Sequence, residues 1–149
     1  MDTTLSRLDT RELRAWRGLL RVHAQLSKAL DAQLIAAHGL PLTSYEVLMY
    51  LSDAQGGQMR MHDLAESVLL SRSGLTRLVD RLEREGYLVR KSCAHDARGA
   101  FAVLTESGRE KLEAARVTHL AGVRDLFLRH FSGDELDWLG DAWDRLLVP

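Results

Sequence analysis

Apolar residues in the middle of the chain recur with the period of a helix. Four of them fall on one helix face: Leu75, Leu78, Val79 and Leu82. Their spacing of i, i+3, i+4 and i+7 predicts a helix that buries one stripe. Ser71 precedes the stripe as a candidate N-cap, because its hydroxyl can accept a bond from a free backbone N–H. Gly86 follows it, where a left-handed residue without a Cβ commonly ends a helix.

A shorter apolar pattern lies just before this helix, near Met61–Ser67. Its inner face consists of Leu64, Ala65 and Val68. Two short helices joined by a tight turn predict a helix-turn-helix, although the turn at Leu69-Leu70 contains no glycine.

The period changes to two after Gly86, which predicts β-strands. The strands are expected over Tyr87–Cys93 and Ala100–Leu104, and residues 94–99 join them as a charged loop. A short edge strand around Met59-Arg60 is expected to pair with this hairpin. The predicted fold class is therefore mainly α with a small β-wing (α+β), a winged helix-turn-helix.

The exposed face of the central helix combines hydroxyl groups with arginines. At about 100° per residue, Ser73, Thr76, Arg77, Asp80 and Arg84 point away from the apolar stripe. Such a face suits base edges and phosphates, although an ordinary solvated helix surface has the same composition. The candidate DNA-binding residues, including two in the wing, are Ser71, Arg72, Ser73, Thr76, Arg77, Arg84, Asp96 and Arg98.

Two segments resemble a known family. The run from Leu70 to Glu83 resembles the recognition helix of the MarR family of bacterial transcriptional regulators. Asp96-Ala97-Arg98, followed by Leu104-Thr105, is similar to the wing pattern D-x-R-x5-L-T of that family. The length and helix order agree over nearly the whole chain. The resemblance implies a homodimer that binds pseudo-palindromic double-stranded operator DNA as a repressor and releases it when a small molecule binds.

Long amphipathic segments flank the central region. Asp9-Thr10-Arg11-Glu12 has the spacing of a capping box and predicts a helix to Ala37. One face of that helix is apolar: Leu13, Trp16, Leu19, Leu20, His23, Leu26, Leu30 and Leu34. The opposite face carries Arg7, Arg11, Arg14, Arg17 and Arg21, which we interpret as solvated rather than DNA-contacting. So long a helix exceeds what one small core needs, and we expect part of it to contact a partner chain.

Further capping boxes predict the remaining helices. Thr43-Ser44-Tyr45-Glu46 is expected to open a helix to about Ala54. Thr105 is expected to cap a helix over Glu106–His130, and Ser132 with Glu135 a last helix. The whole chain, 1–149, then forms one domain. Residues of about 9–37 and 106–149 supply dimerisation helices, and about 43–105 form the DNA-binding region.

A ligand pocket is expected between the first two helices and the long fifth helix. The candidates are Trp16, His23, Tyr45, Met49 and His119. Tyr45 and Met49 lie on a different side of their helix from its core-facing residues. His23 lies within an apolar face, either as a core or interface histidine or as the polar group of an apolar ligand pocket. The resemblance implies phenolic or aromatic carboxylic acids as ligands.

Composition and charge support a selective DNA-binding protein. The 149 residues are 46% hydrophobic and 28% charged, which is typical of a soluble domain. No apolar run approaches the roughly 20 residues of a membrane helix, and no signal peptide begins the chain, so we expect a cytoplasmic protein without a membrane partner. The net charge is −1, but residues 71–98 carry +3 and the remainder −4. A modestly basic head on an acidic body suits selective binding.

Other functions lack their motifs. The chain has no glycine-rich phosphate loop, G-x-S-x-G or H-E-x-x-H, so we expect neither an enzyme nor a cofactor. No metal site is expected, because His119 and His130 would lie about 16 Å apart on one helix. Cys93 is interpreted as inert, although Arg90 and Lys91 nearby leave a redox role open. A winged helix that docks a protein instead of DNA is the alternative function, and the polar face argues against it.

Overall fold

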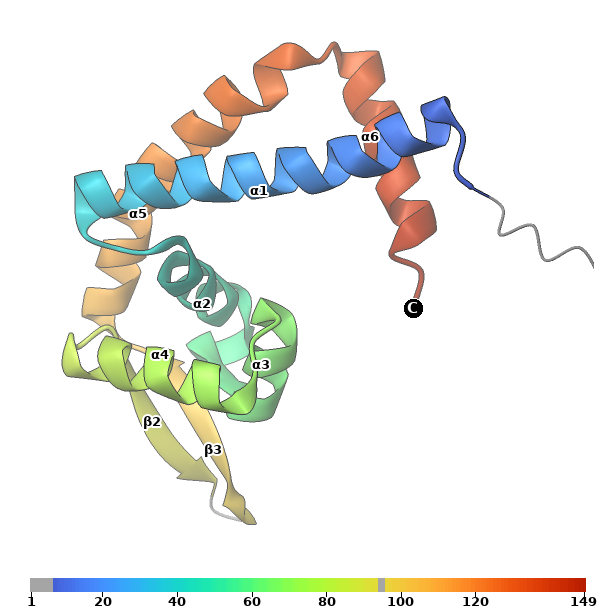
Figure 1. Cartoon of the computed structure of the whole chain (residues 1–149). Coiled ribbons are helices and arrows are strands. Elements are labelled where there is room, and N and C mark those ends of the chain that lie inside the picture. The colour runs from blue at the N-terminus through green and yellow to red at the C-terminus, as the bar shows by residue number, and fades with distance from the viewer. Residues whose placement is uncertain (1–6, 94–95) are drawn as a thin grey trace, which may run out of the picture.

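The computed structural model describes residues 7–93 and 96–149, without the side chains of 93 and 96–98 (Figure 1). Its helices are α1 (Thr10–His38), α2 (Leu42–Asp53), α3 (Met61–Val68), α4 (Arg72–Arg84), α5 (Glu106–Leu126) and α6 (Gly133–Leu146). Its strands are β1 (Gln58–Arg60), β2 (Leu88–Cys93) and β3 (Asp96–Leu104). Short 3-10 turns occupy Gln55–Gly57 and Leu128–His130. No helix in this part of the chain is long and apolar enough to cross a membrane.

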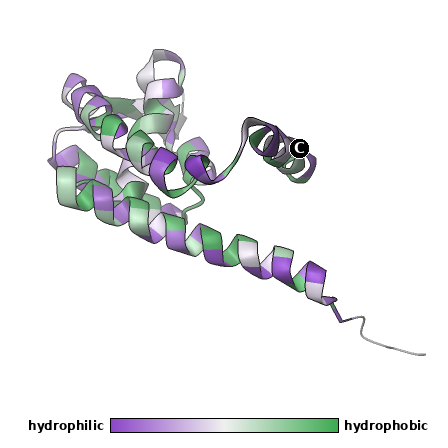
Figure 2. Cartoon of the chain, turned by 90° about the horizontal axis from the view of Figure 1, so that it is seen from above, coloured by the Kyte–Doolittle hydropathy of each residue, from purple (hydrophilic) through white to green (hydrophobic). Residues whose placement is uncertain are grey.

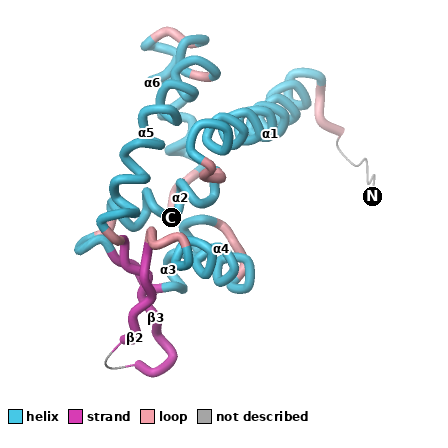
Figure 3. The backbone as a smooth tube through the Cα atoms, turned by 90° about the vertical axis from the view of Figure 1, so that its left-hand side faces the viewer, coloured by secondary structure: helices cyan, strands magenta, loops and turns pink. Residues whose placement is uncertain are grey.

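The expected winged helix-turn-helix is confirmed. The sheet is antiparallel in the order β1-β3-β2, and the edge strand pairs Met59 with Ala102. β2 and β3 project from the helices as a two-stranded ribbon (Figure 3). β3 begins at Asp96 rather than at the predicted Ala100, because its pairing with β2 continues past the alternating apolar positions that reveal a strand in the sequence.

Most of the predicted caps are present. Asp9 and Glu12 bond to each other's backbone N–H, as do Ser132 and Glu135. The side chains of Ser71 and Thr105 cap α4 and α5.

The capping box predicted at Thr43–Glu46 is wrong. α2 begins at Leu42, two residues before the start that a Thr43 cap predicts, and directly after Pro41, whose ring is compatible with a helix start. The amide of Leu42 donates to Asp31 Oδ1 at 2.8 Å. A carboxylate of α1 therefore supplies the cap that the local sequence was expected to supply.

The predicted end of α5 at His130 is also wrong. The helix stops at Leu126, because Phe127 leaves the helical conformation with φ −127° and ψ −65°. The Phe127 and Phe131 rings pack against each other across the following turn, with centroids 5.1 Å apart. This aromatic contact accompanies the change of direction between α5 and α6 (Figure 1).

The core lies between α2, α3, α4, the sheet and the adjoining ends of α1 and α5. Its largest fully buried apolar side chains are Leu34, Leu40, Leu48, Leu51, Leu64, Leu75, Leu82, Leu88, Leu112, Val47 and Val79. α1 and α5 cross closely at Gly122, where an added Cβ would lie 2.2 Å from Gln33 Oε1. The N-terminal half of α1 and the whole of α6 extend beyond this core (Figure 2).

Candidate nucleic-acid interface

α4 presents one polar face to solvent and buries the other. Leu75, Leu78, Val79 and Leu82 are buried, as their spacing predicted. On the outer side, the sequence-predicted candidates are all exposed: Ser71, Arg72, Ser73, Thr76, Arg77 and Arg84. The structure thus brings these six residues together on one helix and its cap.

Local hydrogen bonds organise the first turns of this face. Ser71 Oγ accepts from the Gly74 amide at 3.1 Å and lies 3.3 Å from Ser73 Oγ. Thr76 Oγ1 donates to the Arg72 carbonyl at 2.8 Å, which leaves its lone pairs free to accept. Arg77 Nε donates to the Ser73 carbonyl at 3.5 Å. The guanidinium therefore remains exposed, with donors available for a base or a phosphate.

The turn before α4 uses a leucine where glycine is usual. Leu69 has φ +57°, and its side chain is 89% exposed. Its amide bonds to the Glu66 carbonyl and that of Leu70 to the Ala65 carbonyl, which closes the end of α3. A bulky residue in this conformation is strained, so the turn is held by the helices that it connects.

The wing residues lie at the far end of β2 and β3 (Figure 3). The backbone of β3 begins at Asp96, but the side chains of Asp96 and Arg98 fall outside the described part of the structure. Their assignment to DNA contact stays a prediction. The interpretation of Cys93 as an inert thiol also stays a prediction, because its side chain is likewise not described.

Asp80 points away from the apolar stripe, as its spacing predicted, but its side chain is engaged in an ion pair. Its carboxylate pairs with Arg90 Nη2 of β2, and Glu83 pairs with the same nitrogen at 3.1 Å. The backbone N–H of Arg90 also donates to Glu83 Oε2 at 2.7 Å. Glu83 accepts hydrogen bonds from the backbone N–H of Arg90 and from its side chain, and these bonds lower the pKa of Glu83. The side-chain bond to Glu83 and the charges of Asp80 and Glu83 raise the pKa of Arg90.

Two of the candidate ligand residues meet between α2 and α5. The rings of Tyr45 and His119 are tilted by 42°, with centroids 4.5 Å apart. Tyr45 is 3% exposed and belongs to the core, because α5 covers the side of α2 on which Tyr45 lies. Its helical position was read from apolar periodicity, which does not register the packing of α5 against that side.

Polar atoms beside this ring pair are buried without partners. His119 Nδ1 and Arg116 Nε have no hydrogen-bond partner among residues 7–93 and 96–149. Burial lowers the pKa of His119 and raises the pKa of Tyr45, and the nearby charge of Arg116 opposes the second effect. Arg116 was missed in the sequence, where its position one helical turn before His119 was the available signal.

The other ligand candidates are dispersed. His23 is exposed on α1, and its charge partly offsets the rise that burial causes in the pKa of Glu46. Met49 is half-buried against the core. Trp16 is 53% exposed and lines a different hollow, so the structure does not bring it to Tyr45 and His119.

The hollow that contains Trp16 is an apolar groove of about 680 Å³ between α1 and α6. We call it the α1–α6 groove. Its aromatic lining consists of Trp16, Phe127, Phe131, Trp138 and Trp143. Trp138 is 63% exposed, and the following Leu146 and Leu147 are exposed as well. An apolar surface of this kind typically marks an interaction site.

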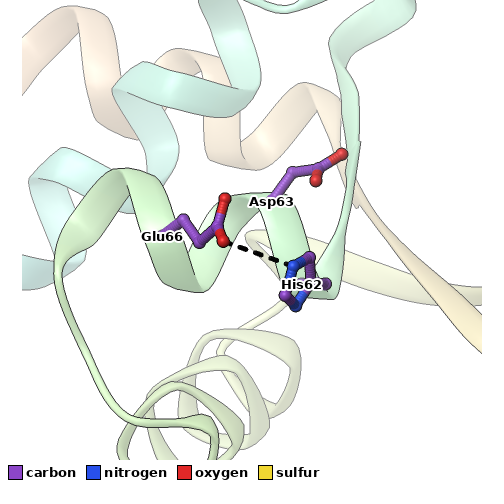
Figure 4. A group of neighbouring side chains, drawn as sticks. All are labelled: His62, Asp63 and Glu66. Atoms are coloured by element: carbon purple, nitrogen blue, oxygen red, sulfur yellow. Dashed lines mark ion pairs between the residues drawn. The ribbon is translucent and has the colours of Figure 1, made fainter. Parts of the chain in front are cut away.

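A small cluster of possible metal ligands lies on α3, where the sequence predicted no metal site. His62, Asp63 and Glu66 place ligand atoms within 4.8 Å of one another (Figure 4). All three are exposed, and His62 Nε2 lies 3.3 Å from Glu66 Oε1. This geometry is that of a surface i,i+4 pair with a neighbouring acid.

Comparison with known proteins agrees with the geometry. The pattern of the MarR family matches residues 38–99. The chain is similar to AbsC, a MarR family transcriptional regulator from Streptomyces coelicolor (TM-score 0.87, 35% identity, 95% of each chain). It is also similar to Sco3205 from the same organism, solved in complex with DNA (TM-score 0.90, 31% identity, 97% of this chain and 92% of that one). The transcriptional repressor YetL of Bacillus subtilis is 26% identical over 97% of this chain and 88% of its own.

Proposed function

Since the chain belongs to the MarR family of winged helix-turn-helix transcriptional regulators, we propose that it represses transcription as a homodimer bound to pseudo-palindromic operator DNA. It is a regulator and not an enzyme, and we place its action in the cytoplasm. The observation that carries the proposal is the exposed polar face of α4 opposite a fully buried apolar stripe. The similarity to Sco3205, which was solved with DNA, supports the same reading.

The residues of α4 divide into base-reading and phosphate-binding groups. Arg77 projects from the first half of the helix, where a guanidinium can bond a guanine bidentately in the major groove. Ser73 and Thr76 flank it and complete the base-reading surface. Ser71 and Arg72 at the start of the helix, with Arg84 near its end, contact phosphates and fix the register.

The wing supplies a second contact. Arg98 enters the minor groove, where narrow A·T-rich segments attract a cation, and Asp96 holds its side chain extended. This assignment rests on the resemblance of residues 96–105 to the family's wing pattern.

Dimerisation supplies a second DNA-binding region, that is, a second copy of about residues 43–105. The α1–α6 groove leaves several tryptophans exposed on a single chain, and a second copy would bury them. In this arrangement residues of about 9–37 and 106–149 form the dimer, and about 43–105 read DNA. Two heads on two-fold-related half-sites bind with the avidity of the pair.

A small effector is proposed to bind beside Tyr45 and His119. Within the described part of the chain, Nδ1 of His119 and Nε of Arg116 have no hydrogen-bond partner, so they offer polar contacts in an apolar setting, which suits an aromatic carboxylic acid. His23 and Met49 are candidates for its rim. We expect the effector to bind best to the dimer in which the spacing of the two DNA-binding regions does not match the operator. Such an effector must weaken operator binding by the same factor by which operator DNA weakens effector binding.

Titrations on operator and scrambled DNA at several salt concentrations test the proposal. The operator is first recovered by footprinting the region upstream of the coding sequence. Arg77→Ala should flatten the preference at one or two base pairs of each half-site, by roughly 1–3 kcal/mol. Arg98→Ala should weaken all binding and reduce the salt slope by about one unit per head, and Asp96→Ala should partly reproduce it. Wild-type affinity and slope in both arginine variants would favour the protein-docking alternative.

A further inference from the structure

Arg90 joins the wing to the recognition helix. Its Nη2 contacts Asp80 Oδ1 at 2.5 Å and Glu83 Oε1 at 3.1 Å, and its Nε donates to the same Glu83 oxygen at 3.3 Å. The Arg90 backbone N–H donates to the other Glu83 oxygen at 2.7 Å. One side chain of β2 therefore holds two acids of α4, and we call these three residues the α4–β2 clamp.

The clamp lies between the two surfaces proposed to contact DNA. Asp80 follows Arg77 by three residues on α4, and the wing tip lies beyond Arg90 along β2. The covalent connection between α4 and β2 passes through Gly86, a left-handed residue with φ +83°. The base of the ribbon is held by the pairing of β1 with β3 and by the buried Leu88 and Ala102. Arg90 lies two residues further along β2 and adds a contact with α4 through two guanidinium nitrogens, which constrains direction as well as distance.

Stability is a minor part of what the clamp contributes. The side chains of Arg90, Asp80 and Glu83 are 35%, 44% and 34% exposed, and ion pairs so accessible to solvent add little free energy of folding. The pairing also neutralises Arg90, which removes it from the cations available to phosphates. What remains is geometry: the spacing between the recognition helix and the wing.

We propose that Arg90 is a positioning residue, which fixes the wing relative to the recognition helix through Asp80 and Glu83 and thereby sets operator specificity. This inference rests on the proposed function, because it requires that both surfaces touch DNA together. When they do, a rigid connection converts the second contact into an intramolecular event. The affinity for operator DNA increases as a result, whereas the affinity for scrambled DNA, which is bound through phosphates alone, increases little.

Four variants of the full-length protein test the clamp: Glu83→Gln, Arg90→Gln, Arg90→Lys and the swap Glu83→Arg/Arg90→Glu. Affinities for operator and scrambled DNA, and the salt slope, are measured for each. Glu83→Gln and Arg90→Gln should both lower the operator-to-scrambled affinity ratio, by about threefold to tenfold. Their effects on scrambled DNA should be opposite, because the first frees a cation beside the phosphates and the second leaves two unpaired acids.

The remaining variants separate geometry from charge. Arg90→Lys keeps the charge but loses the planar fork, so it should lower the ratio without changing the salt slope. The swap should restore part of the ratio lost in the single variants. Glu85→Gln, an exposed neighbour outside the clamp, is the matched control and should leave the ratio at its wild-type value. Thermal unfolding of each variant confirms that the head is folded.

The outcomes distinguish the clamp from the proposed function. An unchanged ratio in Glu83→Gln and Arg90→Gln, with a lowered ratio in Arg77→Ala, would overturn the clamp and leave DNA reading by α4 intact. An unchanged ratio in Arg77→Ala as well would overturn the proposed function itself. Equal losses in Glu85→Gln and Glu83→Gln would show that charge alone, and not the pairing with Arg90, sets the ratio.

Discussion

The proposed DNA-binding region, about residues 43–105, and the helices that extend from it differ in how much of their apolar surface one chain buries. We call the first of these regions the head. In the head, α2, α3, α4 and the sheet bury a continuous set of leucines and valines. Around the α1–α6 groove, by contrast, α6 has no buried residue, and of the 13 residues between Thr10 and Val22 none is buried. The head is complete in one chain. The groove leaves apolar surface uncovered in one chain, which is where the proposed second copy would pack.

The largest expected effect comes from removing the incomplete half. A chain lacking the first ten residues and everything after Phe131 should sediment as a monomer and lose specific operator binding, by about 10²-fold or more as avidity disappears. The head should stay folded, since its core residues are all retained. Analytical ultracentrifugation and circular dichroism check both parts, with a chain shortened only by residues 147–149 as control. A stable truncated dimer would contradict the arrangement.

Substitutions in the two regions should differ in how they depend on protein concentration. Leu82→Ala, in the fully buried core, should lower the free energy of unfolding by about 2–5 kcal/mol at any protein concentration. Trp16→Ala, in the half-exposed groove, should act through dimerisation. Its unfolding midpoint should therefore fall below wild type only at concentrations where the wild-type protein is dimeric. Urea denaturation at two concentrations about a hundredfold apart separates the two behaviours, and identical profiles would remove the distinction.

Local signals in the sequence predicted the elements of both regions well. The capping boxes at Asp9 and Ser132 lie within four residues of the amides that they bond, and both are present. The box predicted at Thr43 is absent, because the helix begins earlier and Asp31 of α1, eleven residues before Leu42, accepts from the Leu42 amide. The predicted apolar stripe of α4 was confirmed, because α4 packs against the core on one side only and that side is the one with the apolar residues.

Contacts between elements distant in sequence account for what the sequence did not show. Asp80 points away from the apolar stripe, as predicted, but its pairing with Arg90 depends on where β2 folds back and could not be read from the helix alone. Burial of Tyr45 depends on α5 packing against α2, and the 74 positions that separate Tyr45 from His119 carry no periodic signal. Arg116 offered a local signal, its position one helical turn before His119, but its proximity to Tyr45 of α2 becomes visible only in the fold.

A substitution at the contact between α5 and α2, where the two regions adjoin, is expected to have a smaller effect, on the affinity for an effector. Arg116→Met keeps much of the side-chain length but removes the charge and the N–H donors. If Arg116 anchors an anionic effector, the affinity for an aromatic carboxylate should fall by about tenfold to a hundredfold. Affinity for the corresponding neutral amide should change much less, which makes that amide the control. Calorimetric titration measures both, and equal losses would show that Arg116 acts through packing.

The smallest expected effect is a pH dependence at the same contact. Burial lowers the pKa of His119 below its ordinary value, so between that lowered pKa and about 6.5 the unfolded chain binds a proton that the folded chain does not. The free energy of unfolding should therefore be fully retained above about pH 6.5 and fall as the pH drops through this window.

His119→Phe keeps the aromatic contact with Tyr45 and cannot titrate, so it should flatten the pH profile of stability across this window. His62→Phe, at an exposed histidine of α3, is the matched control and should retain the wild-type profile. Urea denaturation at fixed protein concentration and several pH values measures the difference. An unchanged slope in His119→Phe would place the pH dependence in other groups. A flattened slope would assign the pH dependence to His119 at the contact between α2 and α5, where its Nδ1 has no partner among residues 7–93 and 96–149.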